Sequence, residues 1–261
     1  MIAHVMDIAH ADTIAGLVKG LAVLESFDTE RQRLNATQSA QRAGLTRAAA
    51  RRHLLTLAHV GYLETDGSFF WLSARALRLA GAYLASSRLP RVIQPALNRL
   101  AAETQDVYSA VVLDGDEVVI IARSAGLAPS NQLLAYGRHL GARLPAHATS
   151  TGRMLLAALS KAELKAWLAS RTLPRLTPHT TTDVRAFKAL LAQAAAQDFC
   201  IAGDEHELGV HAIAVPLRDV KGRTVAALNV IVPQRRLDDA LLRGQALARL
   251  RAAASELRQM L

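Results

Sequence analysis

The 261-residue chain lacks the features of a secreted, membrane-spanning or disulfide-stabilised protein. Cys200 is its single cysteine, so no disulfide can form within the chain, and a reducing cytoplasm is the expected compartment. No apolar run approaches the roughly 18 to 20 residues that cross a bilayer, and the first residues include acids where a signal peptide carries lysine or arginine. We therefore expect no membrane partner. With 51% hydrophobic and 20% charged residues, the chain should fold around a packed core.

Motifs that carry catalysis or hold metals and cofactors are also missing. There is no Walker loop, no G-x-G-x-x-G fingerprint and no G-x-S-x-G turn, and the nine histidines match no zinc spacing. The nearest approach runs from His206 to His211, but it has one residue too many for H-E-x-x-H. The acids beside it, including Glu205, are predicted to form a solvated loop, and Cys200 lies in an apolar run that favours a buried, inert thiol. We predict that the chain is no enzyme and holds neither metal nor cofactor.

Acidic residues are absent from 31–63 as well, and this gap contains the most informative stretch of the chain. Within it, the pattern predicts two short helices that meet at a tight turn. Gly44 supplies the backbone freedom that the turn needs, and the Thr46 hydroxyl can cap the second helix. This arrangement is typical of a helix-turn-helix.

The second helix of this pair carries its charge at one end. Arg47 and Arg51 lie four residues apart and share a face with Arg52, while Ala48 and Ala49 keep this end slim enough to enter a DNA major groove. The alternative is a solvated basic helix pair in an ordinary helical domain. A net charge of +9 favours a polyanionic partner, but most of that excess lies beyond residue 85. The prediction of DNA binding therefore depends on the local pattern.

The segments on either side of the helix pair predict a winged helix-turn-helix. Between residues 14 and 27, apolar residues recur at helical spacing, and this face is expected to pack under the helix pair. The face consists of Ile14, Leu17, Val18, Leu21, Leu24 and Phe27. After the pair, residues 61–72 predict a β-hairpin with its turn at Asp66-Gly67, and the tip of this wing offers Ser68 and backbone groups to DNA.

The pattern of the chain changes near residue 90. Ser73 can cap a helix that runs to about Ser86, and Pro90 is expected to open the next helix after a break. Strands are then predicted at 107–113, 117–123, 132–136, 199–202, 212–217 and 224–232, and helices at 150–159, after Ser160, at 183–196 and from about 237. This alternation predicts an α+β body behind a small DNA-binding head, an arrangement that suits a ligand-sensing regulator.

Small and hydroxyl-bearing residues gather at the start of the predicted helix at 150–159. The free N–H groups and the dipole at such a helix start can hold an anion, and a carboxylate fits there. Ordinary capping by Thr149 or Ser150 explains the same residues. The local sequence favours neither explanation.

Five motifs in this order resemble the IclR family of bacterial transcription regulators over almost the whole chain. They are GLVKGLAVLESF, GLTRAAARRHLLTLAHVGYLE, LDGDEVVIIAR, LPAHATSTGRMLLAAL, and the pair ELGVHAIAVPLRD with GRTVAALNV. TRAAARR, the pattern from Arg143 to Arg153, and VAALNV are similar to the branch that controls β-ketoadipate-pathway genes, typified by the protocatechuate and p-hydroxybenzoate regulators.

This resemblance implies a winged helix-turn-helix domain at 14–72, a linker helix at 73–89 and a GAF-like effector-binding domain at 90–261. It also implies a homodimer, often a dimer of dimers, on an inverted-repeat operator of double-stranded DNA, with RNA polymerase as a further partner of an activator. The residues expected to contact DNA are Thr37, Gln38, Arg42, Thr46, Arg47, Arg51, Arg52 and Ser68.

The resemblance also implies an effector pocket. Matched position by position, it falls on Leu144, His147, Ser150, Thr151, Ala202, Ala212, Asn229 and Ile231. In similar proteins that sense glyoxylate or pyruvate, an aspartate stands at the position of Ala202 and a cysteine at that of Ala212. A small keto acid would therefore lose polar partners here, and a larger, flatter ligand fits better.

We therefore expect an aromatic carboxylate effector, such as p-hydroxybenzoate or protocatechuate. Its carboxylate is expected at Ser150 and Thr151, and its ring substituents near Asn229 and His147. Three alternatives remain: a regulator of the same type that senses a non-aromatic organic acid, a small-molecule-binding enzyme on a GAF-like sheet, and an interaction module that binds no DNA.

Overall fold

The computed structural model describes residues 9–28, 31–124, 139–169, 171–232 and 234–261. The chain divides into two compact units, one ending at Ser86 and one from Ser87 to Leu261. They are called the head and the body below, and each is described by itself. The strand expected at 132–136 lies outside the described residues. In the described part of the chain, no helix is long and apolar enough to cross a membrane.

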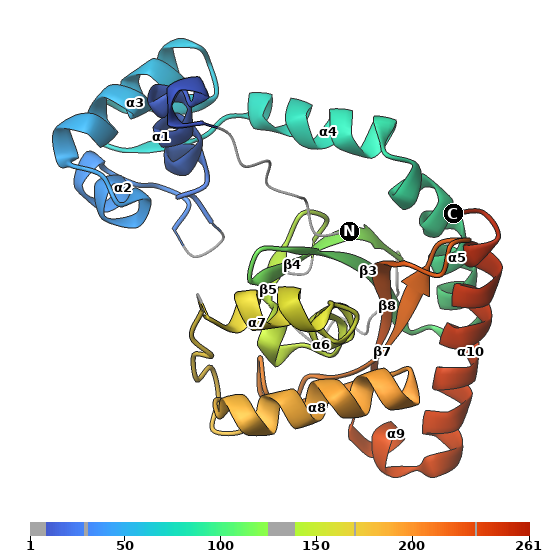
Figure 1. Ribbon diagram of the computed structural model, residues 1–261. Coiled ribbons are helices and arrows are strands. Elements are labelled where there is room, and N and C mark those ends of the chain that lie inside the picture. The colour runs from blue at the N-terminus through green and yellow to red at the C-terminus, as the bar shows by residue number, and fades with distance from the viewer. Residues whose placement is uncertain (1–8, 29–30, 125–138, 170, 233) are drawn as a thin grey trace. The chain divides into compact units, whose positions relative to one another are not determined.

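The head is a winged helix-turn-helix. After a short 3-10 turn at His10–Asp12 come three helices, α1 (Ala15–Leu24), α2 (Ala36–Ala43) and α3 (Arg47–His59), and then the two-stranded antiparallel wing of β1 (Leu63–Thr65) and β2 (Phe70–Leu72) (Figure 1). Its core combines side chains of α1, α3, both strands of the wing and the segment between α1 and α2, and Ala36 and Ala43 of α2 pack against it. The buried members are Val23, Phe27, Leu34, Leu54, Leu63 and Phe70.

The turn between α2 and α3 confirms the expected local chemistry. Gly44 has a φ of +64°, which favours glycine, and the Thr46 hydroxyl accepts a hydrogen bond of 3.3 Å from the Ala49 amide. The cap at the start of α2 was not predicted from the sequence. There, Asn35 caps the helix and Gln38 closes a reciprocal capping box on the Asn35 amide at 2.9 Å.

The expectation for the first helix was wrong for most of the predicted face, although Phe27 lies in the core and Leu24 packs against it. Four of the six apolar residues expected to pack under the helix pair are exposed, with exposed fractions of 47–70%: Ile14, Leu17, Val18 and Leu21. The opposite side of α1 faces inward, with Val23 buried and Gly20 next to α3, where an added Cβ would lie 3.7 Å from the His53 ring. Because α1 is apolar almost all round, its periodicity could not indicate which face is buried.

The wing is held by hydrogen bonds within its turn and by Arg33, which precedes α2 in the chain. Asp66 accepts hydrogen bonds from the amides of Phe69 and Ser68, at 2.8 and 3.0 Å, and these bonds hold the pKa of its carboxyl below the usual value. Arg33 pairs with Asp66 at 2.5 Å and stacks over the Trp71 ring at 4.4 Å. These contacts fix the hairpin tip beside Ser68.

Two helices follow the wing with one residue between them. A 3-10 turn at Ala74–Ala76, capped by Ser73, leads into α4 (Leu77–Ser86), and α5 (Arg88–Thr104) begins after Ser87. The second helix therefore begins two residues before Pro90, where it was expected to start. Pro90 lies in the first turn of α5. The N–H groups of a first turn have no acceptor within their helix, so the missing N–H of proline costs little there.

The body is built on a six-stranded antiparallel sheet with the strand order β5-β4-β3-β8-β7-β6. The strands are β3 (Val107–Asp114), β4 (Glu117–Arg123), β5 (Arg143–Pro145), β6 (Cys200–Gly203), β7 (His211–Arg218) and β8 (Thr224–Val232). All except the short β5 were expected within one or two residues at each end.

Helices cover both faces of this sheet (Figure 1). On one face lie α5 and α10 (Ala240–Arg258), with the short α9 (Gln234–Asp238); on the other lie α6 (Ser150–Ala157), α7 (Lys161–Ala169) and α8 (Val184–Gln197). Alternate residues of β8 serve the two faces: Leu228 and Val230 pack toward α5 and α10, while Ala227 packs toward α6. The α+β class is confirmed, and the same alternation directs Asn229 toward α6.

Candidate functional site

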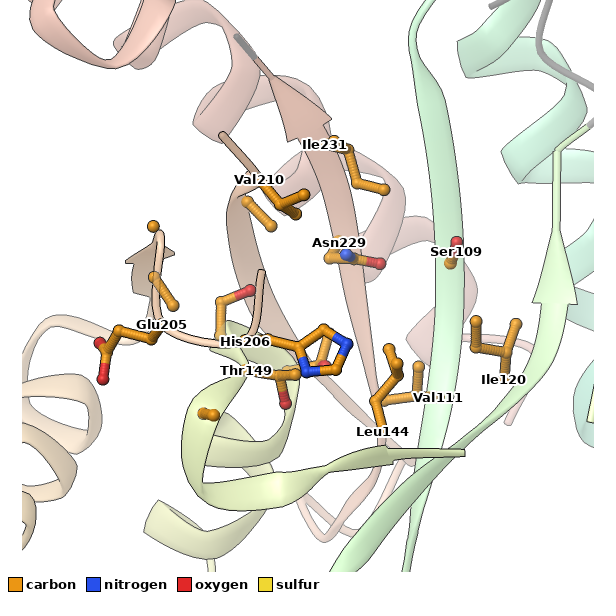
Figure 2. A pocket seen from close by; sticks show the side chains of 16 residues that line it. Ser109, Val111, Ile120, Leu144, Thr149, Glu205, His206, Val210, Asn229 and Ile231 are labelled. Atoms are coloured by element: carbon orange, nitrogen blue, oxygen red, sulfur yellow. The ribbon is translucent and has the colours of Figure 1, made fainter. Parts of the chain in front are cut away.

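A cavity lies between the start of α6, strand β5 and the α6-facing side of the sheet. It encloses about 610 Å³ of space, including its open mouth. Figure 2 shows side chains from both the sheet and the surrounding segments directed into it. The lining consists of Ser109, Val111, Ile120, Leu144, Ala148, Thr149, Ser150, Thr151, Ala202, Gly203, Glu205, His206, Val210, Ala212, Asn229 and Ile231.

Strand register builds the floor of this cavity from two rows. Ala202, Ala212 and Ile231 are cross-strand neighbours on β6, β7 and β8 and form a flat apolar row. Ser109 on β3 faces Asn229 on β8 and forms a polar row beside it. Segments far apart in the sequence meet here because antiparallel pairing brings alternate residues of each strand onto one face.

Asn229 brings an unused hydrogen-bond acceptor to the cavity. Its Oδ1 is buried and has no hydrogen-bond partner among the described residues. A buried acceptor left unpaired costs free energy, roughly 1–3 kcal/mol. A ligand that donates a hydrogen bond at this point would remove that cost.

The start of α6 combines both explanations that the sequence left open. The Thr149 hydroxyl caps the helix by accepting from the Gly152 amide at 3.1 Å. The amides of Ser150 and Thr151 make no hydrogen bond to any described residue, although both side chains are buried. Two N–H groups at the positive end of the helix dipole therefore remain available to an anion.

Seven of the eight residues expected in an effector pocket line this cavity; His147 does not. The residue is 3% exposed, and its Nε2 lies 3.0 Å from the Pro174 carbonyl oxygen. Burial lowers the pKa of the His147 imidazole, because the charged form would lose its water. Through this contact, His147 holds the segment around Pro174 against the 3-10 turn at Ala146–Ala148.

Glu205 and His206 also line the cavity, and neither residue was predicted there from the sequence. The prediction that Glu205 belongs to a solvated loop was wrong: its side chain is 12% exposed and pairs with Arg153. Burial raises the pKa of the Glu205 carboxyl, but the bonds and charge of Arg153 outweigh that effect, so the pKa lies below the usual value. Nothing in the local sequence indicated the pair, because its members lie 52 residues apart.

The described residues contain no group of three His, Cys, Asp or Glu side chains that could hold a metal ion. His206 lines the cavity, while His211 lies 3.6 Å from Asp204. Cys200 is buried, and burial raises the pKa of its thiol to about 11, so the reactive thiolate is scarce at neutral pH.

On the head, the residues expected to contact DNA separate into two groups. The side chains of Gln38 and Arg42 are engaged within the head: Gln38 in the capping box, and Arg42 with the Ser26 carbonyl at 2.6 Å and with Asp28. The others are exposed: Thr37, Thr46, Arg47, Arg51, Arg52 and Ser68. The three exposed arginines at the start of α3 form the basic end that the sequence predicted.

Two family models match this chain. The IclR helix-turn-helix domain matches residues 16–67, and the model for the C-terminal domain of bacterial transcriptional regulator IclR matches residues 81–259. The chain belongs to the IclR family. Its relatives in this family are regulators of transcription, not enzymes.

Two IclR-family relatives come from Acinetobacter baylyi. The Pca operon regulatory protein is 48% identical over 97% of this chain and 91% of its own length. The p-hydroxybenzoate hydroxylase transcriptional activator is also 48% identical, over 97% of this chain and 94% of its own length. Among solved structures, an IclR homologue from Microbacterium hydrocarbonoxydans in complex with 4-hydroxybenzoate is 31% identical, covers 94% of this chain and 98% of its own, and has a TM-score of 0.71.

Proposed function

We propose that this IclR-family regulator controls genes of p-hydroxybenzoate and protocatechuate catabolism, and that its effector is an aromatic carboxylate bound in the cavity. The observation that carries the proposal is the pairing of a flat apolar floor with two polar ends. One end is the start of α6 and the other is the Ser109–Asn229 row. The names of the two Acinetobacter relatives and the 4-hydroxybenzoate complex support this class of ligand.

The carboxylate is assigned to the start of α6. The amides of Ser150 and Thr151 have no partner among the described residues, and no Lys or Arg in the described part of the chain lines the cavity. Backbone N–H groups, the helix dipole and the His206 ring would therefore stabilise the negative charge. The ring would lie on the row of Ala202, Ala212 and Ile231, with a ring hydroxyl donating to Asn229 Oδ1.

Titration calorimetry tests this assignment with 4-hydroxybenzoate, protocatechuate, benzoate, glyoxylate and pyruvate. We expect the two hydroxylated aromatic acids to bind more tightly than benzoate, and benzoate to bind more tightly than the keto acids. Preferential binding of glyoxylate or pyruvate would support a regulator that senses a non-aromatic acid. Absence of binding by both hydroxylated aromatic acids would refute the proposal.

The head is proposed to read an inverted-repeat operator as a homodimer. The exposed arginines at the start of α3 support entry of this helix into the major groove. Two apolar surfaces of the head support self-association: the exposed face of α1, and α4, which has no buried side chain and exposes Leu77, Leu79 and Tyr83. Effector binding would change the placement of paired heads through α4. The equilibrium between two arrangements of the heads would shift only as far as the effector's affinities for those arrangements differ.

Gel-shift titration of the region upstream of the protein's own gene tests the DNA half of the proposal. Paired heads should favour two half-sites about one helical turn apart, and a 4-hydroxybenzoate titration should change the affinity or the migration of the complex. Equal binding to operator and scrambled DNA would contradict it.

A further inference from the structure

The loop at 204–210 joins β6 to β7 and forms one wall of the cavity through Glu205, His206 and Val210. Figure 2 shows that its side chains point in different directions: the His206 ring projects into the cavity, and the Glu205 carboxylate is directed away from it. A mostly buried carboxylate needs a charged or hydrogen-bonding partner in such a position.

Arg153 is that partner, and it is fixed on the other side of the loop. It lies on α6, is 1% exposed, and donates from Nη1 and Nη2 to the two Glu205 oxygens at 2.6 and 2.5 Å. Its Nε donates to the His147 carbonyl at 3.0 Å, and its guanidinium lies 5.9 Å from the centre of the Phe187 ring. The guanidinium is therefore held by the 3-10 turn at Ala146–Ala148 and by α8, and the loop is attached to it through one carboxylate.

The segment at 177–181 holds the same loop by its backbone. The Thr177 hydroxyl donates to the Asp204 carbonyl at 2.5 Å, and the Thr180 hydroxyl donates to the Glu205 carbonyl at 2.6 Å. The Thr181 amide donates to Glu205 Oε2 at 2.9 Å. Glu205 is thus the point at which side-chain and backbone contacts to the loop converge.

From this arrangement we infer that Arg153 is a positioning residue of the effector pocket. Acting through Glu205, it holds the 204–210 loop in place as the cavity wall, turns the Glu205 carboxylate away from an anionic effector, and keeps the His206 ring inside. Arg153 does not itself line the cavity, so it acts without touching the ligand. The statement about the ligand rests on the proposed function, whereas the statement about the loop concerns the unliganded protein.

A purely structural ion pair would stabilise the fold without affecting the charge that the ligand meets. If Arg153 were replaced by methionine, Glu205 would become an unpaired carboxylate in the cavity wall and would repel a benzoate anion. Lowering the pH would protonate that carboxylate and restore binding. Glu205 interacts electrostatically with His147 and Cys200, and Asp204, His206 and Glu207 lie beside it on the loop, so a variant that keeps all five and lacks Glu205 is the required comparison.

Hydrogen exchange on the unliganded full-length protein tests the loop. We expect Arg153→Met to speed amide exchange at 204–210 by about tenfold or more, and Glu205→Gln, which preserves size, to speed it by a smaller factor. The matched control is Arg218→Met, which breaks a bidentate pair with Asp198 at the opposite end of the same hairpin. If neither Arg153→Met nor Glu205→Gln speeds loop exchange beyond this control, the inference is overturned; Glu205→Gln keeps it testable even if Arg153→Met does not fold.

Binding of 4-hydroxybenzoate at about pH 5.5 and about pH 7.5 tests the charge. We expect Arg153→Met to bind roughly tenfold more weakly than wild type at the higher pH and to recover at the lower one, whereas Arg153→Met/Glu205→Gln shows no such recovery. Equal weakening of both variants at both pH values would overturn the role in charge placement. If wild type binds no hydroxybenzoate, the proposed function fails, and the exchange measurement alone decides whether Arg153 positions the loop.

Discussion

Replacing Asn229 by leucine should weaken effector recognition while leaving the unliganded protein at least as stable. Asn229 Oδ1 is buried without a partner among the described residues, so the folded protein already bears the cost of an unsatisfied acceptor. Leucine has a similar volume and no polar atom, and its side chain would lie next to Ile231 in the lining of the cavity. The substitution therefore removes a destabilising feature from the unliganded state and a hydrogen-bond partner from the liganded one.

The magnitude follows from that single acceptor. Pairing a buried oxygen that is otherwise unsatisfied is worth roughly 1–3 kcal/mol, which corresponds to about a 5- to 150-fold difference in Kd. Wild type should therefore bind 4-hydroxybenzoate more tightly than benzoate by a factor in this range. In Asn229→Leu the ratio of the two Kd values should fall to about one, because the unpaired acceptor at position 229 is then absent for both ligands.

Titration calorimetry with both ligands measures the ratio, and thermal unfolding without ligand measures stability. Asn98→Leu is the control, because Asn98 lies on α5 away from the cavity and its Oδ1 accepts from Gln94. The control should keep the wild-type ratio. A ratio in Asn229→Leu equal to that of wild type would refute the reasoning, since the ring hydroxyl would then be recognised elsewhere.

Three further outcomes are expected. Arg51→Ala should weaken operator binding by roughly 1–3 kcal/mol in a gel shift. Arg42→Ala should mainly lower the melting temperature, because Arg42 is bonded to Asp28 and the Ser26 carbonyl. Equal losses of operator affinity in the two variants would contradict this division. Leu17→Lys places a charge on the exposed face of α1 and should shift sedimentation toward the monomer; an unchanged distribution would exclude that face from the dimer. Because burial raises the pKa of Cys200 to about 11, iodoacetamide at about pH 8 should label unfolded but not native protein, as read by mass spectrometry.

The sequence alone determined the features that depend on neighbouring residues. The turn at Gly44, the cap at Thr46 and the wing turn at Asp66-Gly67 were predictable because each concerns a few consecutive residues and the backbone groups that they satisfy. The main strands of the body followed from alternation and turn residues for the same reason. The motifs that resembled the IclR family also led to the correct family.

Only the tertiary structure decided which surfaces face each other. The apolar periodicity of α1 did not indicate that Leu17 would be exposed and Val23 buried, because both faces of that helix are apolar. The cavity was equally beyond local reasoning: strand register places Ser109 opposite Asn229, and a contact across 52 residues pairs Arg153 with Glu205. A charge in a loop is solvated unless a distant side chain reaches it, and the chain path that brings Arg153 there is a property of the whole fold.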